Sequence, residues 1–388
     1  FANGNESHNL FGSLWAKNVV KEMEAMGLYG RPVISRGGPV GGQRYIIPWP
    51  GDLHHGLELL KVDLNWLRNA GLSAYPFVTV NLGGWGSGHG LEEQNLIRRA
   101  INIIPLIPIS QLVGWGKTGE NAMLPWLMSP KQQELLRYYL KLRYRLHPYL
   151  YSSAIEAHRT AKPILAALVL DYQDDPNTFN KDYHFMLGRQ LLVAPVLEKT
   201  EKWDVYLPSG QWVHYWTGKK YTGGKTVRVN APLYGKDGLP MFVKIGAIIP
   251  MMPEMSYIYE KAPDPITLDI YPEAGVSSSY VMYDCQAPKN SPVNKTTFKC
   301  SADAQSIEIA ISRSDVAYEL WVHHDGTPAS VVVDSKTLPA MKTKFDYDTA
   351  QEGWYHGPGC FYGSDKLRTI NIKIPRSSNS HIVRVKKS

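Results

Sequence analysis

The sequence predicts a parallel α/β unit followed by two all-β units. Apolar strands and amphipathic helices alternate as far as residue 162, which is typical of a parallel barrel or an open sheet. Beyond residue 163 the helical period disappears, and short segments rich in Val, Ile, Tyr and Trp alternate with Gly and Pro turns, as in β-sandwiches. Prolines between residues 253 and 265 divide this second region, so we expect units at 1–162, 163–255 and 256–388.

The α/β unit is expected to open with a helix over residues 8–26, with Ser7 as its cap and Gly27 after its end. The elements expected next are strands Arg31–Ser35 and Arg44–Trp49, a helix from Leu57 that stops at Gly71, and strands Leu72–Val80 and Ile101–Ile109. The glycine-rich link Gly37–Gly42 is too short for a crossover helix, which needs about a dozen residues. Either one of the two strands that it joins lies off the sheet, or the barrel is irregular here.

The longest predicted helical segment covers residues 129–160. Ser129, Pro130 and Gln132 form the pattern of a capping box, which predicts where this segment begins. Pro148 should break or kink it, because proline removes a backbone donor and clashes with the preceding turn.

Composition and charge argue for an uncharged ligand. The net charge of +7 is spread over the chain, and its densest basic groups, 199–202, 219–220 and 384–387, are short; nucleic-acid binding requires a contiguous basic surface. No apolar run approaches the roughly 18 residues that span a bilayer. The three cysteines match no zinc pattern, and they fit one disulfide plus a free thiol as well as three reduced thiols. The compartment stays open, with a secreted or periplasmic location favoured.

Three polar residues follow apolar strands, where the active sites of parallel α/β folds gather: Arg36, Asp52 and Asn81. Asp52 stands beside Trp49 and Pro50, and partial desolvation there would raise its pKa and favour the protonated form. A carboxylic acid of this kind can protonate a departing glycosidic oxygen. On the pattern alone, Asp52 is equally explained as a loop residue or a helix N-cap.

Several collinear segments change this balance. Those around the candidate residues are Arg31–Arg36, Gly42–Tyr45 and Trp49–Asp52; the others are His8–Gly12, Gly71–Ser73, Asn81–Trp85, Leu142–Leu146, Pro148–Tyr151, Leu187-Gly188, Leu191–Val196, Trp212, Tyr215–Gly218 and Pro240–Lys244. In this order they resemble glycoside hydrolase family 31 over about residues 8–250. The resemblance implies the C-terminal portion of a (β/α)8 barrel followed by a proximal and a distal β-sandwich.

The resemblance also implies an exo-acting, retaining α-glycosidase without a cofactor. Asp52 matches the family's acid/base, Arg36 an arginine that binds the sugar, and Trp49 a wall of the sugar pocket. A retaining enzyme needs a second carboxyl group about 5–5.5 Å away as nucleophile. The only acid before His8 is Glu6, whose context does not match, so we expect the nucleophile from an N-terminal remainder of the same enzyme.

Departures from the family's pattern concern specificity. Asn81 stands where the glucosidases carry Asp, and Gln111 and Val113 stand at their Arg-x-His pair, which makes galactose-configured sugars candidates. Trp85, in the glycine-rich loop after Asn81, is expected to line the site.

His54-His55 shows no third ligand at a suitable spacing, so no metal is expected. A transglycosylase and a non-catalytic carbohydrate-binding protein with a degenerate barrel remain alternatives.

Overall fold

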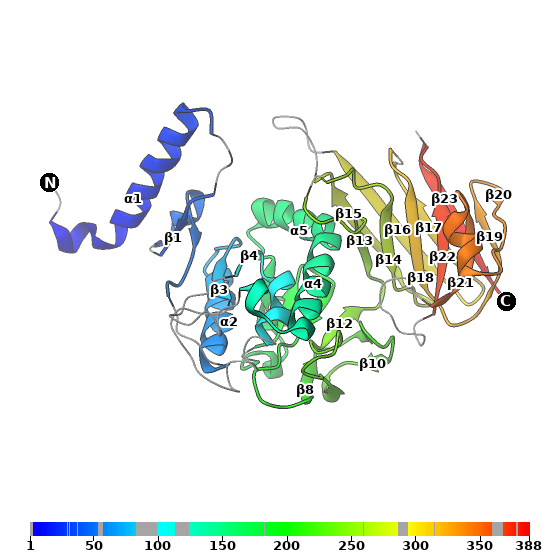
Figure 1. The fold of residues 1–388 in the computed structure, drawn as a ribbon, viewed down its shortest axis with the longest axis horizontal. Coiled ribbons are helices and arrows are strands. Elements are labelled where there is room, and N and C mark those ends of the chain that lie inside the picture. Colours follow the sequence, from blue (N-terminus) through cyan, green and yellow to red (C-terminus); the bar gives the residue numbers. More distant parts are fainter. Residues whose placement is uncertain are drawn as a thin grey trace.

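Two pairs of parallel strands and the helices around them form the N-terminal part of the molecule (Figure 1). The computed structural model describes residues 3–28, 30, 32–36, 38–52, 57–82, 99–112, 124–181, 183–258, 260–285, 294–313, 315–358, 368–377 and 379–388. The elements of the N-terminal part are α1 (Gly4–Ala25), β1 (Ile34–Ser35), β2 (Ile47–Pro48), α2 (Leu57–Leu72), β3 (Thr79–Leu82), β4 (Ile109–Leu112), α4 (Pro130–Arg145) and α5 (His147–Thr160). β1 pairs in parallel with β2, and β3 pairs in parallel with β4.

The link between β1 and β2 contains a single 3-10 turn, Gly42–Arg44, in place of a crossover helix. The link is longer than predicted because β2 begins at Ile47, not at Arg44. Its conformation is held by Tyr75, whose hydroxyl donates to the backbone oxygens of Gly38 (2.9 Å) and Pro39 (2.7 Å). A Cβ atom on Gly42 would lie 2.6 Å from that hydroxyl, so the close approach requires glycine.

Several predicted boundaries in this part are wrong. Residues 101–103 are helical and Ile104–Leu106 form a 3-10 turn, so the strand predicted over Ile101–Ile109 begins only at Ile109. Ile101, Ile103 and Leu106 are buried, and a buried helix and a buried strand share that apolar pattern. Ser7 lies inside α1 and does not cap it, since the helix begins at Gly4.

Gly71 lies inside α2, where it was predicted to mark the end of the helix. A Cβ atom at this position would lie 3.0 Å from Pro163 and 3.2 Å from the backbone oxygen of Leu165. The glycine therefore allows α2 to pack closely against β5 (Leu165–Ala167). Leu72 is the last residue of α2, so the strand predicted over Leu72–Val80 cannot begin there. It begins at Thr79.

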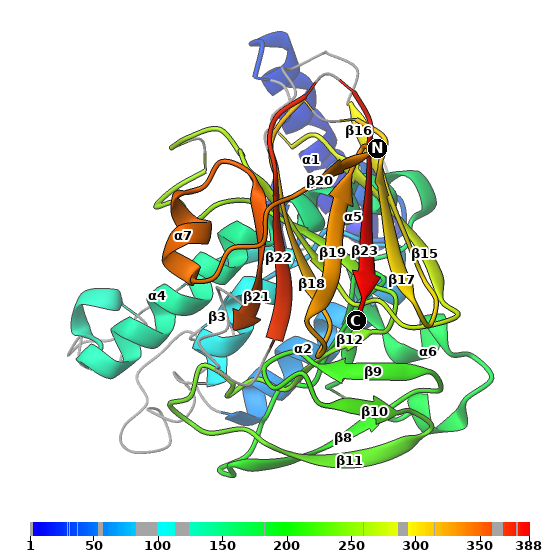
Figure 2. The same ribbon diagram turned by 90° about the vertical axis from the view of Figure 1, so that its right-hand side faces the viewer.

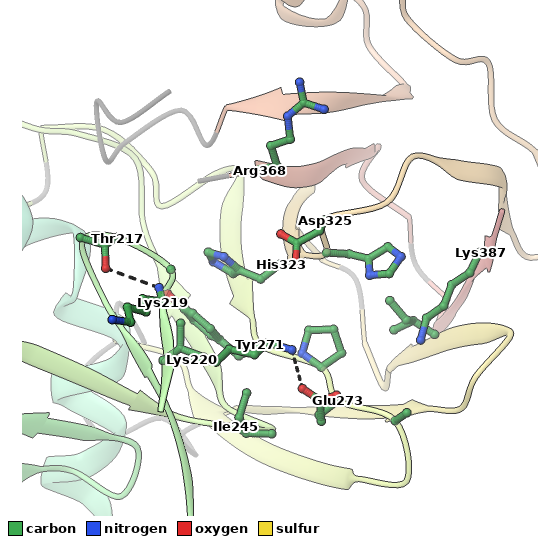
Figure 3. A pocket seen from close by; sticks show the side chains of 16 residues that line it. Thr217, Lys219, Lys220, Ile245, Tyr271, Glu273, His323, Asp325, Arg368 and Lys387 are labelled. Carbon is green, nitrogen blue, oxygen red and sulfur yellow. Dashed lines mark hydrogen bonds and ion pairs between the residues drawn. The ribbon is translucent and has the colours of Figure 1, made fainter. Parts of the chain in front are cut away.

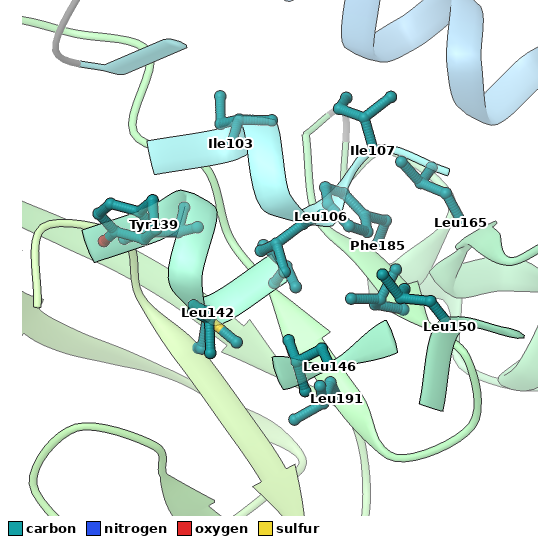
Figure 4. Close-up of a cluster of buried hydrophobic side chains, with 14 of the residues drawn as sticks. Ile103, Leu106, Ile107, Tyr139, Leu142, Leu146, Leu150, Leu165, Phe185 and Leu191 are labelled. Atoms are coloured by element: carbon teal, nitrogen blue, oxygen red, sulfur yellow. The ribbon is translucent and has the colours of Figure 1, made fainter. Parts of the chain in front are cut away.

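The helices α4 and α5 form as predicted, and they lie at the centre of the main core. The Ser129 hydroxyl and the Gln132 side chain form the capping box, and the long helical segment breaks at Leu146, two residues before Pro148. Tyr139, Leu142, Leu146 and Leu150 are buried between the apolar turn before β4 and the first all-β unit (Figure 4).

The first all-β unit has two layers. One is an antiparallel sheet in the order β10-β9-β12-β7-β6-β5, and the other is the pair β11-β8. Its strands are β5, β6 (Phe185–Leu187), β7 (Leu191–Val193), β8 (Lys202–Leu207), β9 (Gln211–His214), β10 (Lys220–Thr222), β11 (Lys225–Asn230) and β12 (Met241–Lys244). A separate apolar cluster that includes Trp212 and Phe242 fills the space between the layers.

The second all-β unit is a sandwich of two larger sheets, seen edge-on at the right of Figure 1 and from its outer side in Figure 2. One sheet contains β13 (Ile248–Met251), β14 (Ile266–Ile270), β18 (Tyr318–His323), β22 (Arg368–Ile374) and β21 (Gly353–Pro358), and the other contains β15 (Ser277–Tyr283), β16 (Lys295–Ala302), β17 (Ser306–Ile311), β23 (His381–Lys387), β19 (Pro328–Val333) and β20 (Lys336–Thr337). The short helix α7 (Lys344–Thr349) lies beside β21. β13 pairs with β14 across the proline-rich segment, so this sheet includes a strand that precedes residue 255.

Arg99 joins the helical part to the first sandwich. It is 2% exposed, and its guanidinium donates to the backbone oxygens of Thr200, Ala231 and Gly238. Burial lowers the pKa of Arg99 to about 10, which still leaves it charged at neutral pH.

A second buried arginine joins α4 to the outer sandwich. The guanidinium carbon of Arg145 lies 4.8 Å from the centre of the Trp321 ring, and α5 adds a stacked pair, Tyr149 on Tyr280, with 5.8 Å between ring centres. Both sandwiches are therefore packed against the same two helices.

Among the helices that the structure describes, none is both long and apolar enough to cross a membrane.

A buried carboxyl group in α2 makes stability depend on pH. Burial raises the pKa of Asp63 from 3.8 to about 7. The folded state therefore holds a proton that the unfolded state releases, and the resulting stabilisation is complete below pH 3.8 and is lost as the pH rises through about 7. We expect Asp63→Asn to flatten this dependence and, at pH 8, to raise the free energy of unfolding by up to about 4 kcal/mol. Denaturant unfolding at pH 5 and pH 8 measures the effect, with the exposed Asp174→Asn as control; equal pH dependence in wild type and Asp63→Asn would contradict it.

Candidate active site

The parallel pairing of β1 with β2 brings Arg36 and Asp52 together. Ser35 lies opposite Pro48, so the chain leaves both strands at the same edge of the sheet. The Nη2 atom of Arg36 lies 2.8 Å from the Oδ2 atom of Asp52. The two side chains are 58% and 36% exposed, so the ion pair lies on an open surface that a ligand can reach.

Trp49 forms one side of this arrangement. The guanidinium carbon of Arg36 lies 5.0 Å from the centre of the Trp49 ring, and the Trp49 amide donates to the Ser35 oxygen at 3.0 Å. The indole nitrogen of Trp49 is buried and has no hydrogen-bond partner among the described residues. Because this nitrogen is buried, Trp49 can meet a ligand in this structure only through the rest of its ring.

Gly51 allows the arginine to lie across the loop. Its φ angle is +97°, and a Cβ atom would lie 2.5 Å from the Nε atom of Arg36. The backbone conformation favours glycine at this position, and a side chain here would require Arg36 to move.

Asn81 belongs to the second strand pair. It lies within β3, one residue before the strand ends, where it was expected just beyond the end. Its register partner on β4 is Gln111, and the Gln111 amide nitrogen donates to the Thr79 hydroxyl at 3.0 Å. The structure therefore places two half-buried neutral amides opposite each other.

The remaining predicted site residues lie outside the part of the chain that the structure describes. These are Trp85, expected to line the pocket, and Val113, at the family's histidine position, together with His54 and His55. Within the described residues, no group of three His, Cys, Asp or Glu side chains is placed to hold a metal ion.

A charged cavity that the sequence did not suggest lies between the two sandwiches (Figure 3). It has a volume of about 510 Å³, and its lining includes Lys219, Lys220, Glu273, Arg368 and Lys387. Two of its lining residues bind a carboxylate buried behind them: Asp269 accepts from the Tyr271 hydroxyl (2.9 Å) and is paired with His323 (2.6 Å). These bonds satisfy a carboxylate that would otherwise be buried without a partner, which is a sufficient structural reason for the cluster.

Comparison with known families identifies the family of the chain. The sequence model described as the glycosyl hydrolases family 31 TIM-barrel domain matches residues 2–153, and that of the family 31 C-terminal domain matches residues 161–249. The chain belongs to glycoside hydrolase family 31. The two parallel strand pairs are thus part of a TIM barrel, and the predicted fold, a partial barrel followed by β-sandwiches, is confirmed.

Individual relatives in the family differ in activity. An α-glucosidase of Bacillus thermoamyloliquefaciens is 31% identical over 281 residues, which cover 72% of this chain and 35% of that protein. An isomaltosyltransferase of Sporosarcina globispora is 26% identical over 381 residues, with 91% and 33% covered. The structure of a family 31 dextranase of Flavobacterium johnsoniae complexed with glucose superposes with a TM-score of 0.88 at 28% identity, covering 99% of this chain and 49% of that one. The chain spans about a third of the length of the curated relatives that it matches.

The contact between Gly51 and Arg36 can be tested in this family 31 chain without any substrate. Gly51→Ala and Gly41→Ala both place alanine at a positive φ angle (+97° and +102°), but only at Gly51 does the new Cβ atom meet Arg36; at Gly41 nothing lies within 4 Å. We expect Gly41→Ala to lower the free energy of unfolding by about 1–2 kcal/mol, and Gly51→Ala by about 1–2 kcal/mol more, because Arg36 must move. Urea unfolding of both variants measures the difference; equal losses would show that Arg36 does not press on Gly51.

Proposed function

We propose that this chain carries the acid/base half of a retaining α-glycoside hydrolase. The observation that carries the proposal is the pairing of Arg36 with Asp52 beside Trp49, at the strand edge where TIM-barrel enzymes place their active sites. Membership in family 31 supports it, because the relatives include enzymes that hydrolyse or transfer α-linked sugars.

In the first step the protonated Asp52 gives its proton to the departing glycosidic oxygen, while a nucleophilic carboxylate forms a bond to the anomeric carbon. In the second step Asp52, now ionised, takes a proton from water, which displaces the carboxylate and restores the configuration of the sugar. Arg36 donates hydrogen bonds to sugar hydroxyls, and these replace its ion pair with Asp52. If a sugar hydroxyl takes the place of water, the same residues perform transglycosylation; the similarity to an isomaltosyltransferase favours this as a second candidate.

We further propose that the nucleophile belongs to a remainder of the enzyme that packs against α1. In Figure 1 this helix projects away from the rest of the molecule. Its large apolar side chains are exposed, Leu10 to 53%, Phe11 to 69%, Leu14 to 54% and Trp15 to 64%. A contiguous exposed apolar surface of this kind is typical of an interface.

The acid role of Asp52 predicts a dependence on the leaving group. In the complete enzyme, we expect Asp52→Asn to slow the cleavage of α-glycosides with poor leaving groups at least about a hundredfold, and that of nitrophenyl α-glycosides less than tenfold, since nitrophenolate departs without a proton. Steady-state kinetics on a panel of sugars measures both, with Glu58→Gln, an exposed carboxylate paired with Lys61, as control. Equal losses for both kinds of leaving group would exclude the acid role, and binding without turnover of any sugar by the wild type would favour a lectin.

The pair Asn81 and Gln111 supports a sugar other than the glucose of the family's α-glucosidases. The resemblance places Asp and Arg at these two positions in glucosidases, and here both charges are replaced by amides at neighbouring register positions of β3 and β4. One negative and one positive charge are lost together, so the net charge of this part of the sheet does not change. The hydrogen-bond donors and acceptors that the two side chains offer to the sugar do change. We therefore propose a galactose-configured sugar, rather than glucose, at the position that is cleaved.

This coupling predicts a non-additive double variant. Asn81→Asp or Gln111→Arg alone introduces an unpaired charge in a half-buried position, so each should lower kcat/KM for the natural sugar at least about tenfold. The double variant should regain stability and shift the preference between nitrophenyl α-glucoside and α-galactoside toward glucoside by roughly tenfold. Kinetics and thermal unfolding of the three variants measure the coupling; additive effects on stability and an unchanged sugar preference would refute it.

A further inference from the structure

A long groove lies along α4, on the side that faces the link between the two sandwiches. Its volume is about 820 Å³. One wall is a helical stripe of α4, spaced at three and four residues, and the other is the segment around Glu254 and Glu260. The residues that line it are Pro125, Trp126, Gln133, Leu136, Arg137, Leu140, Lys141, Tyr144, Glu254, Met255, Ser256, Glu260 and Lys261.

The direction of α4 places one end of this groove on the catalytic side of the barrel. Near the C-terminal end of the helix, Arg143 donates to the backbone oxygens of Pro105 (3.1 Å), Ile107 (2.7 Å) and Pro108 (3.0 Å), just before β4 begins. The C-terminal end of α4 therefore lies at the amino end of β4. The N-terminal end of α4, with Trp126 before it, then lies toward the carboxyl edge of the sheet, where barrel enzymes bind substrate.

The lining of the groove suits a neutral chain of sugars. Trp126, at the catalytic end, is 72% exposed, and a flat aromatic face of this kind stacks on the apolar face of a pyranose ring. The amide nitrogen of Gln133 donates to the Met128 oxygen (2.9 Å), and Glu260 accepts from the Ser256 amide (2.6 Å). The Gln133 amide oxygen, the second Glu260 oxygen and the Arg137 guanidinium offer acceptors and donors to hydroxyl groups.

The charges of the groove are nearly balanced, and one ion pair bridges its walls. Lys141 on α4 binds Glu254 across the groove at 2.7 Å. The cavity between the sandwiches in Figure 3 differs, since its cations outnumber its carboxylates and it contains no exposed tryptophan. A groove with an apolar floor, one exposed tryptophan and paired charges favours a neutral polyhydroxyl ligand over an ionic one.

We propose that this groove is a secondary binding site for neutral α-linked oligosaccharides, which holds sugar units of the substrate beyond the one that is cleaved. The inference rests on the proposed glycosidase function and extends it, because it assigns a long-chain preference to residues outside the catalytic pair. Trp126 supplies the stacking platform, and the stripe of α4 supplies the hydrogen bonds.

The test compares long and short substrates in the complete enzyme. We expect Trp126→Ala to raise the ratio of the KM for maltoheptaose or isomaltoheptaose to the KM for a nitrophenyl α-glycoside by roughly five- to tenfold, the effect of losing one stacking contact. Trp126→Phe should restore most of the ratio. The control is Phe345→Ala, which removes an equally exposed aromatic residue (75%) from α7 in the outer sandwich and should leave the ratio unchanged.

Direct binding separates failure of the groove from failure of the catalytic proposal. Calorimetric titration with the same heptasaccharides should show weaker binding to Trp126→Ala and to Gln133→Ala than to wild type and Phe345→Ala, whether or not the enzyme turns these sugars over. A wild type that hydrolyses no glycoside but binds heptasaccharide through Trp126 would refute the glycosidase proposal alone. Identical KM ratios and affinities in Trp126→Ala and Phe345→Ala would overturn the groove.

Discussion

Two backbone hydrogen bonds, from Ile47 N to Val33 O (2.8 Å) and from Trp49 N to Ser35 O (3.0 Å), hold β2 beside β1 and so fix where Arg36 and Asp52 leave the sheet. Parallel neighbours end at one edge, so residues sixteen positions apart in sequence meet as an ion pair. Tyr75 holds the link between the strands, and Gly51 leaves room for the guanidinium. Together these contacts position the Asp52 carboxyl group beside the Arg36 guanidinium.

The helices α4 and α5 have a corresponding role for the fold as a whole. Their buried faces contribute to the main core, while Arg145 and Tyr149 reach the outer sandwich. Both β units therefore share these two helices as packing partners. Tyr149 also donates to the Leu187 oxygen at 2.7 Å, and Gly188 must lack a side chain to admit it.

Local patterns were sufficient to predict the parts of the fold with a short-range physical cause. Ser129 with Gln132 predicted the start of α4, Pro148 predicted the break before α5, and the alternation of residues predicted the sandwiches. The strand expected over Ile101–Ile109 was wrong because complete burial removes the periodicity that separates helix from strand. Gly71 was wrongly predicted to end its helix. Glycine is needed there because Pro163 packs closely against it, and this tertiary contact cannot be seen in the local sequence.

The candidate site shows the same division. Arg36 and Asp52 could be named from the sequence because each follows a predicted strand, and Trp49 because of the resemblance to family 31; the structure brings these three together. The register of Asn81 opposite Gln111 could not be foreseen, since pairing between strands thirty residues apart depends on the whole sheet. The role of Arg99 could not be predicted from the sequence. Its partners are backbone oxygens more than a hundred residues away, and every residue type has such an oxygen.

That arginine has a mechanical consequence. The buried guanidinium of Arg99 donates charge-assisted hydrogen bonds to three carbonyl oxygens of the neighbouring sandwich. Rotation of this sandwich against the helical part would therefore require the bonds from Arg99 to Thr200, Ala231 and Gly238 to break together.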